Sequence, residues 1–218
     1  MDARMTLTDA WPLFGLRLRT EHLVLRMPTD EDLVGLLAVA KAGIHQPGEM
    51  PFGEAWTSLG GPPFDRSFMQ HYWRTRATFS PESWYLNLMV ELDGRPIGAQ
   101  SIEAAGFAIY RTVHTGSWLG LAFQGRGLGK EMREAVLGFA FDGLGARIAE
   151  TSAFLDNGPS NGVTRALGYE ENGVGSLAPE GVARVTQRFR MTAEGWRSRP
   201  RPQLAVEGLD ETRDLFGA

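Results

Sequence analysis

The chain has 218 residues, of which 43% are hydrophobic and 22% charged, a balance that excludes wholesale disorder and fits one compact domain with appendages. Its formal net charge of -4 argues against nucleic acid as a partner, because proteins that follow phosphates carry a clustered excess of basic residues. The chain has no cysteine, which excludes disulfides, thiolate metal sites and cysteine nucleophiles, and no metal is expected.

The sequence shows neither a targeting segment nor a membrane span. Its first residues lack the basic flank, apolar run and cleavage site of a signal peptide. No stretch approaches the roughly 18 apolar residues that a membrane span needs. We therefore expect a cytoplasmic protein with no membrane partner.

The first elements are predicted by alternation and then by helical spacing. Residues Arg17–Arg26 alternate, which predicts a first strand that ends at Pro28. Thr29 and Asp32 resemble a capping box, and the apolar side chains after them recur at helical spacing as far as about Ala42. A strand followed by a helix is the predicted beginning of the domain.

A loop, a helix and a hairpin are predicted next. Residues 43–63 are rich in glycine and proline and are too many for a simple connection, which indicates a functional or mobile loop. A second helix is predicted over Asp65–Phe79. Alternation over Trp84–Val90 and again over Ile97–Ile102, with Asp93-Gly94 between them, predicts a hairpin.

The second half of the chain alternates between strand and helix patterns. A strand pattern over Thr115–Phe123 leads into a glycine loop and a helix whose apolar side chains extend to Ala140. Residues Arg147–Phe154 form another predicted strand, and a short helix closed by Gly168 follows it. The run Val185–Met191 predicts a closing antiparallel strand. This order predicts a partly parallel sheet.

The predicted division of the chain is an N-terminal extension over residues 1–15, one domain over 16–197 and a tail over 198–218. The tail begins with Arg199-Pro200-Arg201-Pro202, which indicates an extended linker. Six tryptophans and twelve phenylalanines leave room for an apolar surface between copies, so a homo-oligomer is compatible with the sequence.

The glycine loop Gln124-Gly125-Arg126-Gly127-Leu128-Gly129 would present backbone N–H groups at the positive end of a helix, which suits a phosphate-bearing ligand. A turn whose glycines serve only the backbone angles is the alternative. A P-loop is disfavoured because Glu131 stands where Ser or Thr would hold magnesium. A dinucleotide fingerprint fails because Lys130 stands where a third glycine is required, which leaves an oxidoreductase a weak alternative.

These residues resemble the GNAT superfamily of acyltransferases. Gln124, Gly127 and Gly129 match the superfamily's phosphate loop, and Asn157-Gly158-Pro159-Ser160 with Leu167-Gly168-Tyr169 resembles its downstream motif. The stretches 18–26 and 192–196 are similar to the ribosomal-protein N-terminal acetyltransferase-like branch, which includes relatives that use succinyl-CoA. The resemblance spans about residues 16–196.

The resemblance implies a GNAT fold of the α/β class, with a mixed central sheet flanked by helices. Two parallel strands, beginning near Thr115 and Arg147, are expected to splay apart and to hold the pantetheine arm of the coenzyme in the V between them. The implied coenzyme A contacts are Leu119, Leu121, Phe123, Gln124, Gly125, Arg126, Gly127, Leu128, Gly129, Lys130, Asn157 and Ser160. Lys130 can equally be a solvated residue of the helix surface.

The implied reaction is transfer of an acyl group from a thioester to an amine, which needs oxyanion stabilisation and proton transfers. The backbone N–H of Leu121 is expected to contact the thioester carbonyl. Ser160 is expected to donate a proton to the thiolate, unless it is only the N-cap of its helix. Many members carry a glutamate on a strand near the position of His114, and no carboxylate occupies it here. Glu103 and His114 are therefore the candidate bases, although surface positions would also explain both.

The resemblance implies acetyl-CoA or succinyl-CoA as donor and a primary amine as acceptor: a protein N-terminus, a lysine or a small amine. A weak base slightly favours an α-amine, whose pKa of about 7.7–8.0 lies below that of lysine, about 10.4. Polar residues expected to approach the acyl end, unless they are simply exposed, are His45, Gln46, Arg66, His71 and Arg74. A non-catalytic acyl-CoA sensor is the alternative function.

Overall fold

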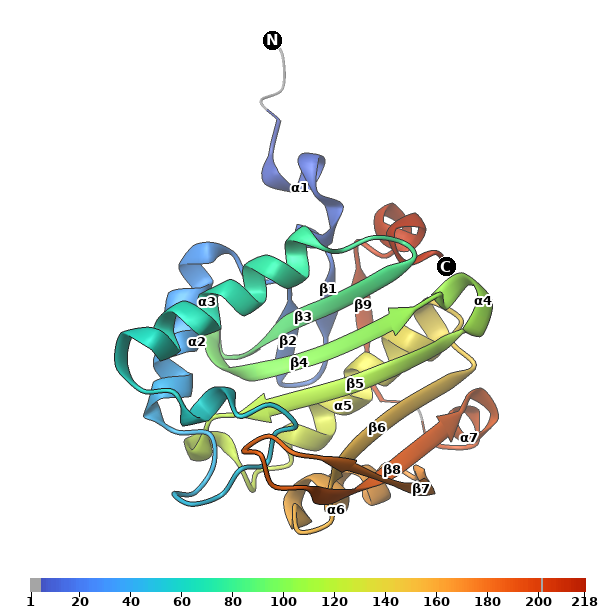
Figure 1. The fold of residues 1–218 in the computed structure, drawn as a ribbon. Helices are drawn as coiled ribbons and strands as arrows, with labels where there is room; N and C mark the ends of the chain where they lie inside the picture. The colour runs from blue at the N-terminus through green and yellow to red at the C-terminus, as the bar shows by residue number, and fades with distance from the viewer. Residues whose placement is uncertain (1–4, 201) are drawn as a thin grey trace.

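Nine strands of the described residues form one mixed sheet in the order β7-β8-β6-β5-β4-β3-β2-β1-β9 (Figure 1). The computed structural model describes residues 5–200 and 202–218. Neighbouring strands are antiparallel except β5 and β6, which are parallel. The strands are β1 (Arg17–Arg19), β2 (Leu23–Arg26), β3 (Ser83–Leu92), β4 (Arg95–Ala105), β5 (Thr112–Leu119), β6 (Ile148–Phe154), β7 (Glu170–Leu177), β8 (Arg184–Thr192) and β9 (Ala205–Glu207).

Helices cover both faces of this sheet. Helices α2 and α3 pack on one face, where Met89 and Ala99 join their apolar cluster, and α5 packs on the other, where Leu88 and Leu119 belong to the main core (Figure 1). The α-helices are α1 (Leu7–Ala10), α2 (Asp30–Ala42), α3 (Gly61–Ala77), α4 (Phe107–Tyr110), α5 (Leu128–Gly138), α6 (Gly158–Ala166) and α7 (Ala193–Arg197). Short 3-10 segments are η1 (Pro12–Phe14), η2 (Trp56–Ser58), η3 (Leu121–Phe123) and η5 (Asp210–Phe216), and η4 (Phe139–Gly143) is a π-helical extension of α5. The predicted α/β class with a mixed sheet is confirmed.

The predicted single first strand is wrong. The segment folds into two antiparallel strands, β1 and β2, with Leu18 opposite Leu25. Between them the Thr20 backbone N–H donates to the Leu23 carbonyl and the Leu23 N–H donates to the Thr20 hydroxyl. The alternation continues through this turn because both strands bury their leucines on the same face, so the pattern alone does not show the reversal.

Several predicted boundaries differ from the structure, those of α3 and β5 by the most. Helix α3 begins earlier, at Gly61, because prolines in the first turn have no N–H that the helix would need to satisfy. Strand β5 starts at Thr112 and ends at Leu119, and the chain then turns through Gly120 into η3. The capping box of Thr29 and Asp32 is present as predicted, and α2 ends at Ala42.

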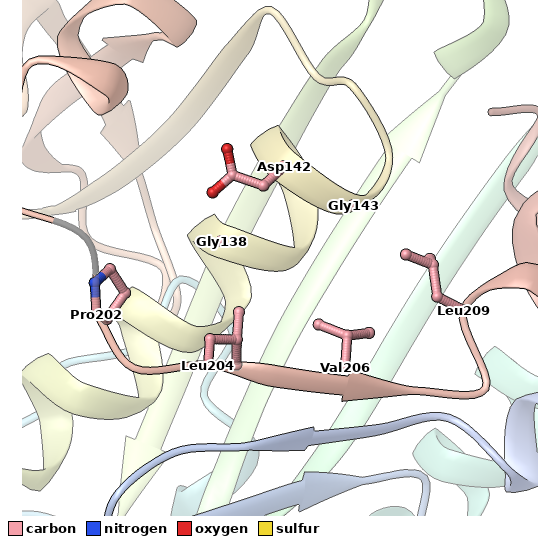
Figure 2. Close-up of a pocket in the computed structure, with 7 residues that line it drawn as sticks. All are labelled: Gly138, Asp142, Gly143, Pro202, Leu204, Val206 and Leu209. Atoms are coloured by element: carbon pink, nitrogen blue, oxygen red, sulfur yellow. The ribbon is translucent and has the colours of Figure 1, made fainter.

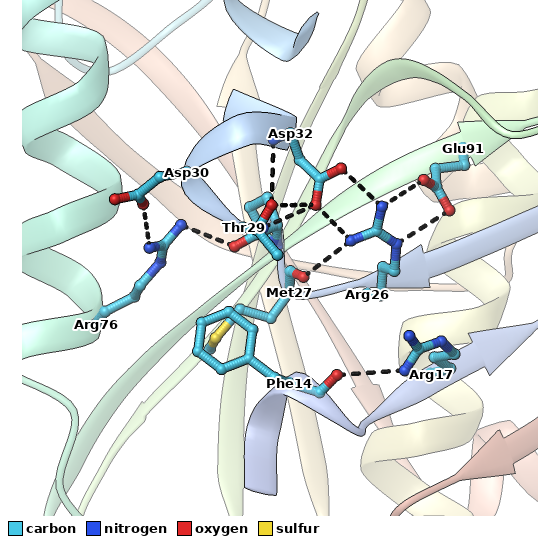
Figure 3. A network of polar contacts seen from close by, with 10 residues as sticks. Phe14, Arg17, Arg26, Met27, Thr29, Asp30, Asp32, Arg76 and Glu91 are labelled. Carbon is cyan, nitrogen blue, oxygen red and sulfur yellow. Dashed lines mark hydrogen bonds and ion pairs between the residues drawn. The ribbon is translucent and has the colours of Figure 1, made fainter. Parts of the chain in front are cut away.

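The ion pairs around Arg26 join three elements (Figure 3). The Arg26 guanidinium donates to both carboxylate oxygens of Asp32 in α2, at 2.6 and 2.9 Å, and to those of Glu91 in β3, at 2.8 and 3.2 Å. Arg76 of α3 donates to Asp30 at 2.6 Å. The network fastens α2 and α3 to the same end of the sheet.

The C-terminal residues extend the sheet and enter its core, which the sequence does not predict. Strand β9 pairs with β1, and Phe216 is fully buried with its carbonyl accepting from the Trp84 indole N–H at 3.2 Å. The segment also packs beside the end of α5, where Leu204, Val206 and Leu209 line a hollow of about 220 Å³ (Figure 2).

Candidate active site

The glycine loop lies between β5 and α5 and leaves its backbone N–H groups available. Gly125 and Gly127 have φ angles of 72° and 82°, in the left-handed region that glycine adopts without strain. Gly127 is the N-cap of α5 and carries no side chain that can cap the helix. Within the described residues, the N–H groups from Gly125 to Gly129 have no hydrogen-bond acceptor. Such donors at a positive helix end form a receptor for phosphate groups.

Gln124 braces this loop, and Leu121 is tied to a different partner than predicted. The Gln124 side-chain nitrogen donates to the carbonyls of Ile44 and Leu119, at 2.7 and 2.8 Å. The Leu121 N–H donates to the Gly43 carbonyl at 2.9 Å, so a contact with a thioester would require this bond to break. Both residues join the loop after α2 to the phosphate loop.

The other predicted coenzyme contacts around the loop fall into two groups. Leu119 and Leu128 are buried, and Phe123 packs partly buried against the main core, so they shape the site with apolar surface. Arg126 and Lys130 are exposed, and the Lys130 ammonium lies 4.0 Å from a Glu134 carboxylate oxygen. Either cation can turn toward a bound phosphate.

Strands β5 and β6 separate beyond their first residues. Only three residue pairs join them: Thr112 with Ile148, Val113 with Ala149, and His114 with Glu150. Both strands continue past the last of these pairs. Beyond it a side chain takes the place of the ladder, since the Thr151 hydroxyl donates to the Thr115 carbonyl at 2.9 Å. The predicted V therefore opens after His114.

Two backbone N–H groups of β5 face this V. The Gly120 N–H donates to the Ile97 carbonyl of β4. In an antiparallel ladder only every second residue of a strand directs its N–H toward the neighbouring strand, so in β5 the N–H groups at even positions face β4. The N–H groups of Ser117 and Leu119 therefore point away from β4, toward the side where β6 has diverged. Leu119 is thus better placed than Leu121 to contact a thioester carbonyl.

At the start of α6, Asn157 is the N-cap and Ser160 is not. The Asn157 side chain accepts from the Ser160 N–H at 3.1 Å. The Ser160 hydroxyl has no hydrogen-bond partner among the described residues and is partly exposed. The capping alternative for Ser160 is therefore wrong, and its hydroxyl is available for proton donation.

A row of polar side chains crosses the sheet at the apex of the V. Tyr85 of β3, Glu103 of β4 and His114 of β5 are successive cross-strand neighbours, and Glu150 is paired with His114. The His114 Nε2 lies 3.6 Å from a Glu150 carboxylate oxygen. Tyr85, Glu103 and His114 line a groove of about 720 Å³ that also includes Tyr110. Both candidate bases thus share one groove.

The electrostatics of this groove favour proton acceptance. Burial raises the pKa of the Glu103 carboxyl above its ordinary value, and the nearby His114 acts in the opposite direction. A carboxylate with a raised pKa is a stronger base. Burial also raises the pKa of the Tyr85 hydroxyl, with Glu103 and Glu54 adding to the effect, so Tyr85 is neutral at pH 7.

The predicted acceptor residues divide between the long loop and α3. In the loop the two ring nitrogens of His45 contact the Gln46 carbonyl and the Thr57 hydroxyl, at 3.0 and 2.8 Å, while the Gln46 side chain is exposed. In α3, His71 lies 3.2 Å from the Asn87 amide, and its pKa is lowered mainly by burial.

Neither arginine of this set reaches the buried part of the site. Arg66 and Arg74 are exposed on α3, although Arg74 lies near enough to His71 to lower its pKa. His71 does reach the groove, because its ring packs edge-on against the Tyr85 ring, with centroids 5.8 Å apart.

Some residues of the site have no motif in the sequence. Tyr85 is one alternating position of a strand, and Glu54 belongs to a loop, yet both influence the same groove. Arg133 carries a clearer signal, because it is an arginine on the apolar stripe of α5, and only 4% of it is exposed. A charge at such a position indicates a polar partner in the core.

The described residues contain neither a candidate metal centre nor a helix that could span a membrane. No group of three or more His, Cys, Asp or Glu side chains is arranged to hold a metal ion. No helix in this part of the chain has the length and apolar character needed to cross a membrane.

Solved structures with the same fold include several acetyltransferases. RimJ of Mycobacterium smegmatis in complex with CoA-disulfide has a TM-score of 0.68 at 20% identity, with 88% of this chain and 91% of that chain covered. RimL, a ribosomal L7/L12 alpha-N-protein acetyltransferase, has a TM-score of 0.61 at 18% identity, covering 79% and 91%. The microcin C7 self-immunity acetyltransferase MccE, in complex with acetyl-CoA and AMP, has a TM-score of 0.61 at 16% identity, with 79% of this chain and 93% of that chain covered.

The family comparison covers the site itself. The model of the acetyltransferase (GNAT) domain matches residues 22–170, which include the groove, the V, the glycine loop and the start of α6. The match covers more than half of the chain, and the fold agrees with it. The protein is therefore an enzyme of the GNAT acetyltransferase family.

Proposed function

We propose that the protein transfers an acetyl group from acetyl-CoA to the α-amine of a protein or peptide N-terminus. The observation that carries this proposal is the set of free N–H groups from Gly125 to Gly129 at an uncapped helix end, next to the split between β5 and β6. The loop suits the pyrophosphate of the coenzyme, and the V suits its pantetheine arm.

The acceptor is proposed to enter through the groove at Glu103 and His114. Position 114 lies three residues from Ser117 along β5, about 10 Å of strand, so the groove and the V are adjacent. The carboxylates of Glu103 and Glu150 favour a cationic amine. An α-amine, with a pKa of about 7.7–8.0, loses its proton to such a base more readily than a lysine does.

The reaction follows from these positions. Glu103 or His114 removes a proton from the ammonium, and the neutral amine nitrogen attacks the carbonyl carbon of the thioester. The carbonyl π pair moves to oxygen, where the Leu119 N–H stabilises the negative charge. A lone pair on that oxygen then re-forms the carbonyl as the carbon–sulfur bond breaks and its electron pair leaves with sulfur. The Ser160 hydroxyl gives its proton to the thiolate, and the proton that the attacking nitrogen loses restores the hydroxyl. Succinyl-CoA carries an additional carboxylate that needs a basic partner, and Arg66 and Arg74, which are predicted to approach the acyl end, are exposed on α3. Acetyl-CoA is therefore favoured as the donor.

Titration calorimetry of Gly127 variants tests the coenzyme site. A Cβ at Gly127 would meet no atom within 4 Å, so Gly127→Ala and Gly127→Glu share the backbone strain and differ in charge. We expect acetyl-CoA to bind the native protein and Gly127→Ala, and to bind Gly127→Glu at least about 100-fold more weakly because a carboxylate would face the phosphates. Equal affinities for the two variants would contradict the site.

Turnover distinguishes donors and acceptors. Release of free CoA is measured with acetyl-CoA or succinyl-CoA, against a peptide with a free N-terminus and against the same peptide blocked at its N-terminus but containing lysine. The proposal predicts release with acetyl-CoA and the free N-terminus. Tight binding of acetyl-CoA without release across a panel of amines would instead favour an acyl-CoA sensor.

A further inference from the structure

Arg133 is a buried cation without a carboxylate partner, placed on the α5 face of the V. Only 4% of the residue is exposed, and in the described part of the chain its hydrogen bonds reach two hydroxyl groups and no carboxylate. One Nη donates to the Ser117 hydroxyl of β5 at 3.0 Å, and the other donates to the Thr151 hydroxyl of β6 at 3.4 Å. The guanidinium therefore spans the two strands where they separate.

The polar atoms around this cation are incompletely satisfied. The Arg133 Nε, the Thr115 hydroxyl and the Tyr169 hydroxyl are buried, and in the described part of the chain none has a partner in good hydrogen-bond geometry, although Thr115 and Arg133 both lie close enough to Tyr169 to act on the pKa of its hydroxyl. Burying unsatisfied polar groups and an unpaired charge destabilises a fold, so an apolar side chain at position 133 would pack at lower cost. Buried polar groups without good partners need an explanation, and a catalytic role is one such explanation.

The two hydroxyls differ in where their hydrogens can go. A guanidinium has donors and no acceptor, so Ser117 and Thr151 both accept from Arg133 and must direct their own hydrogens elsewhere. Thr151 donates to the Thr115 carbonyl at 2.9 Å. Ser117 has no acceptor among the hydrogen bonds of the described residues, and it is only half-buried. Its O–H is therefore available to a molecule in the V.

We infer that the Ser117 hydroxyl, oriented by Arg133, donates a hydrogen bond to the carbonyl oxygen of the bound thioester. Ser117 is then a catalytic residue and Arg133 its positioning residue, and the inference rests on the proposed function. When the amine attacks, the carbonyl π pair moves to oxygen, and the Ser117 O–H meets the charge together with the Leu119 N–H. No proton is transferred in this step. The nearby positive charge strengthens the hydrogen bond because the surroundings are buried.

The direct test is the infrared carbonyl band of acetyl-CoA labelled with carbon-13 at the thioester carbonyl and bound to the protein. We expect the band to lie at lower frequency in the native complex than in the Ser117→Ala complex. Arg133→Met is expected to move the band part of the way from the native frequency toward that of Ser117→Ala. Arg133→Lys is expected to move it less far, because the positive charge remains. Thr151→Val is the matched control, since it removes the other hydroxyl that Arg133 contacts, and its band is expected to stay at the native position.

Steady-state kinetics give a second readout. Ser117→Ala is expected to lower kcat about 100-fold, the usual effect of losing one oxyanion donor, with the affinity for acetyl-CoA within about threefold of native. The double variant with Arg133→Met is expected to be no slower than Ser117→Ala, because Arg133 acts through Ser117. The thermal midpoint of Arg133→Met is expected not to fall, which separates positioning from structural support.

The outcomes separate the two proposals. A thioester band that Ser117→Ala leaves unchanged would overturn the inference alone, because it would show that the hydroxyl does not bond the thioester carbonyl. Losses in kcat that multiply in the double variant would also overturn it. Failure of the native protein to bind acetyl-CoA would overturn the proposed function and, with it, this inference.

Discussion

Asp32 accepts hydrogen bonds from the cap of its own helix and from the neighbouring strand, so its charge state controls how firmly α2 is held. The Arg26 guanidinium lowers the pKa of Asp32 from 3.8 to about 2, outweighing burial, and the Thr29 cap acts in the same direction (Figure 3). A carboxyl whose pKa is lowered by folding contributes stability above its unfolded pKa and loses it as the pH falls through the folded value.

Replacing Asp32 by Asn is therefore expected to destabilise the protein by roughly 1–2 kcal/mol at pH 7, after allowance for partial exposure. The difference should shrink as the pH falls from about 4 to about 2, where native Asp32 is protonated as well. Urea unfolding at several pH values measures it. Asp30→Asn is the control, because that carboxylate is 57% exposed and should contribute less. A difference that does not change with pH would contradict this account.

At the scale of elements, the loop between α2 and α3 is fastened to the far end of the sheet. Arg184 of β8 donates to the Met50 carbonyl at 2.6 Å, stacks over the Phe154 ring at 3.9 Å and pairs with Asp156. The Ser58 hydroxyl donates to Glu180 at 3.3 Å. These contacts with residues of the chain's second half hold the loop in place, and its functional role stays a prediction.

Releasing this loop is expected to affect the acceptor more than the coenzyme. Arg184→Ala should raise the KM for the amine several-fold, because Glu54 of the loop influences the groove, whereas the affinity for acetyl-CoA should change by less than about twofold. Steady-state kinetics with both substrates varied measures the two constants. Arg184→Lys should raise the KM for the amine less than Arg184→Ala does, because the positive charge remains. An equal loss of affinity for both substrates would indicate general destabilisation instead.

At the scale of the whole molecule, the last residues complete the core that carries the site. Phe216 packs edge-on against Phe79, Trp84 and Phe139, with ring centroids 5.0–5.6 Å apart. Phe139 belongs to the extension of α5, the helix that the glycine loop precedes. The C-terminal segment thereby supports the far end of α5.

Phe216→Ala is expected to destabilise the protein by about 3–5 kcal/mol, because it removes a fully buried ring and leaves a cavity. Denaturant unfolding measures the loss, and Glu211→Ala, at an exposed position of the same segment, should be close to native. A small effect for Phe216→Ala would mean that the segment does not belong to the cooperative fold.

The division of the chain into an N-terminal extension, a domain and a tail stays a prediction. The cytoplasmic location and the homo-oligomeric assembly also stay predictions.

Local patterns made much of this site predictable. The capping box, the hairpin at Asp93-Gly94 and the glycine loop before α5 each depend on residues close in sequence, and all three lie where they were predicted. The reversal at residues 20–22 was missed because the alternation continues through it. Strand β7 was missed because it lies exposed at the edge of the sheet and has no buried face to impose alternation.

The sequence by itself pointed to the family through the resemblance of its motifs, and it determined the glycine loop and the succession from β5 through α5 and β6 to α6, because these elements depend on backbone freedom and on spacing along the chain. Only the tertiary structure decided which groups are free to act. The Leu121 amide is engaged by Gly43, whereas the N–H groups of Ser117 and Leu119 face the V, because strand pairing gives each amide its partner or withholds it. The position of Arg133 between the Ser117 and Thr151 hydroxyls likewise arises from tertiary packing, which no local pattern expresses.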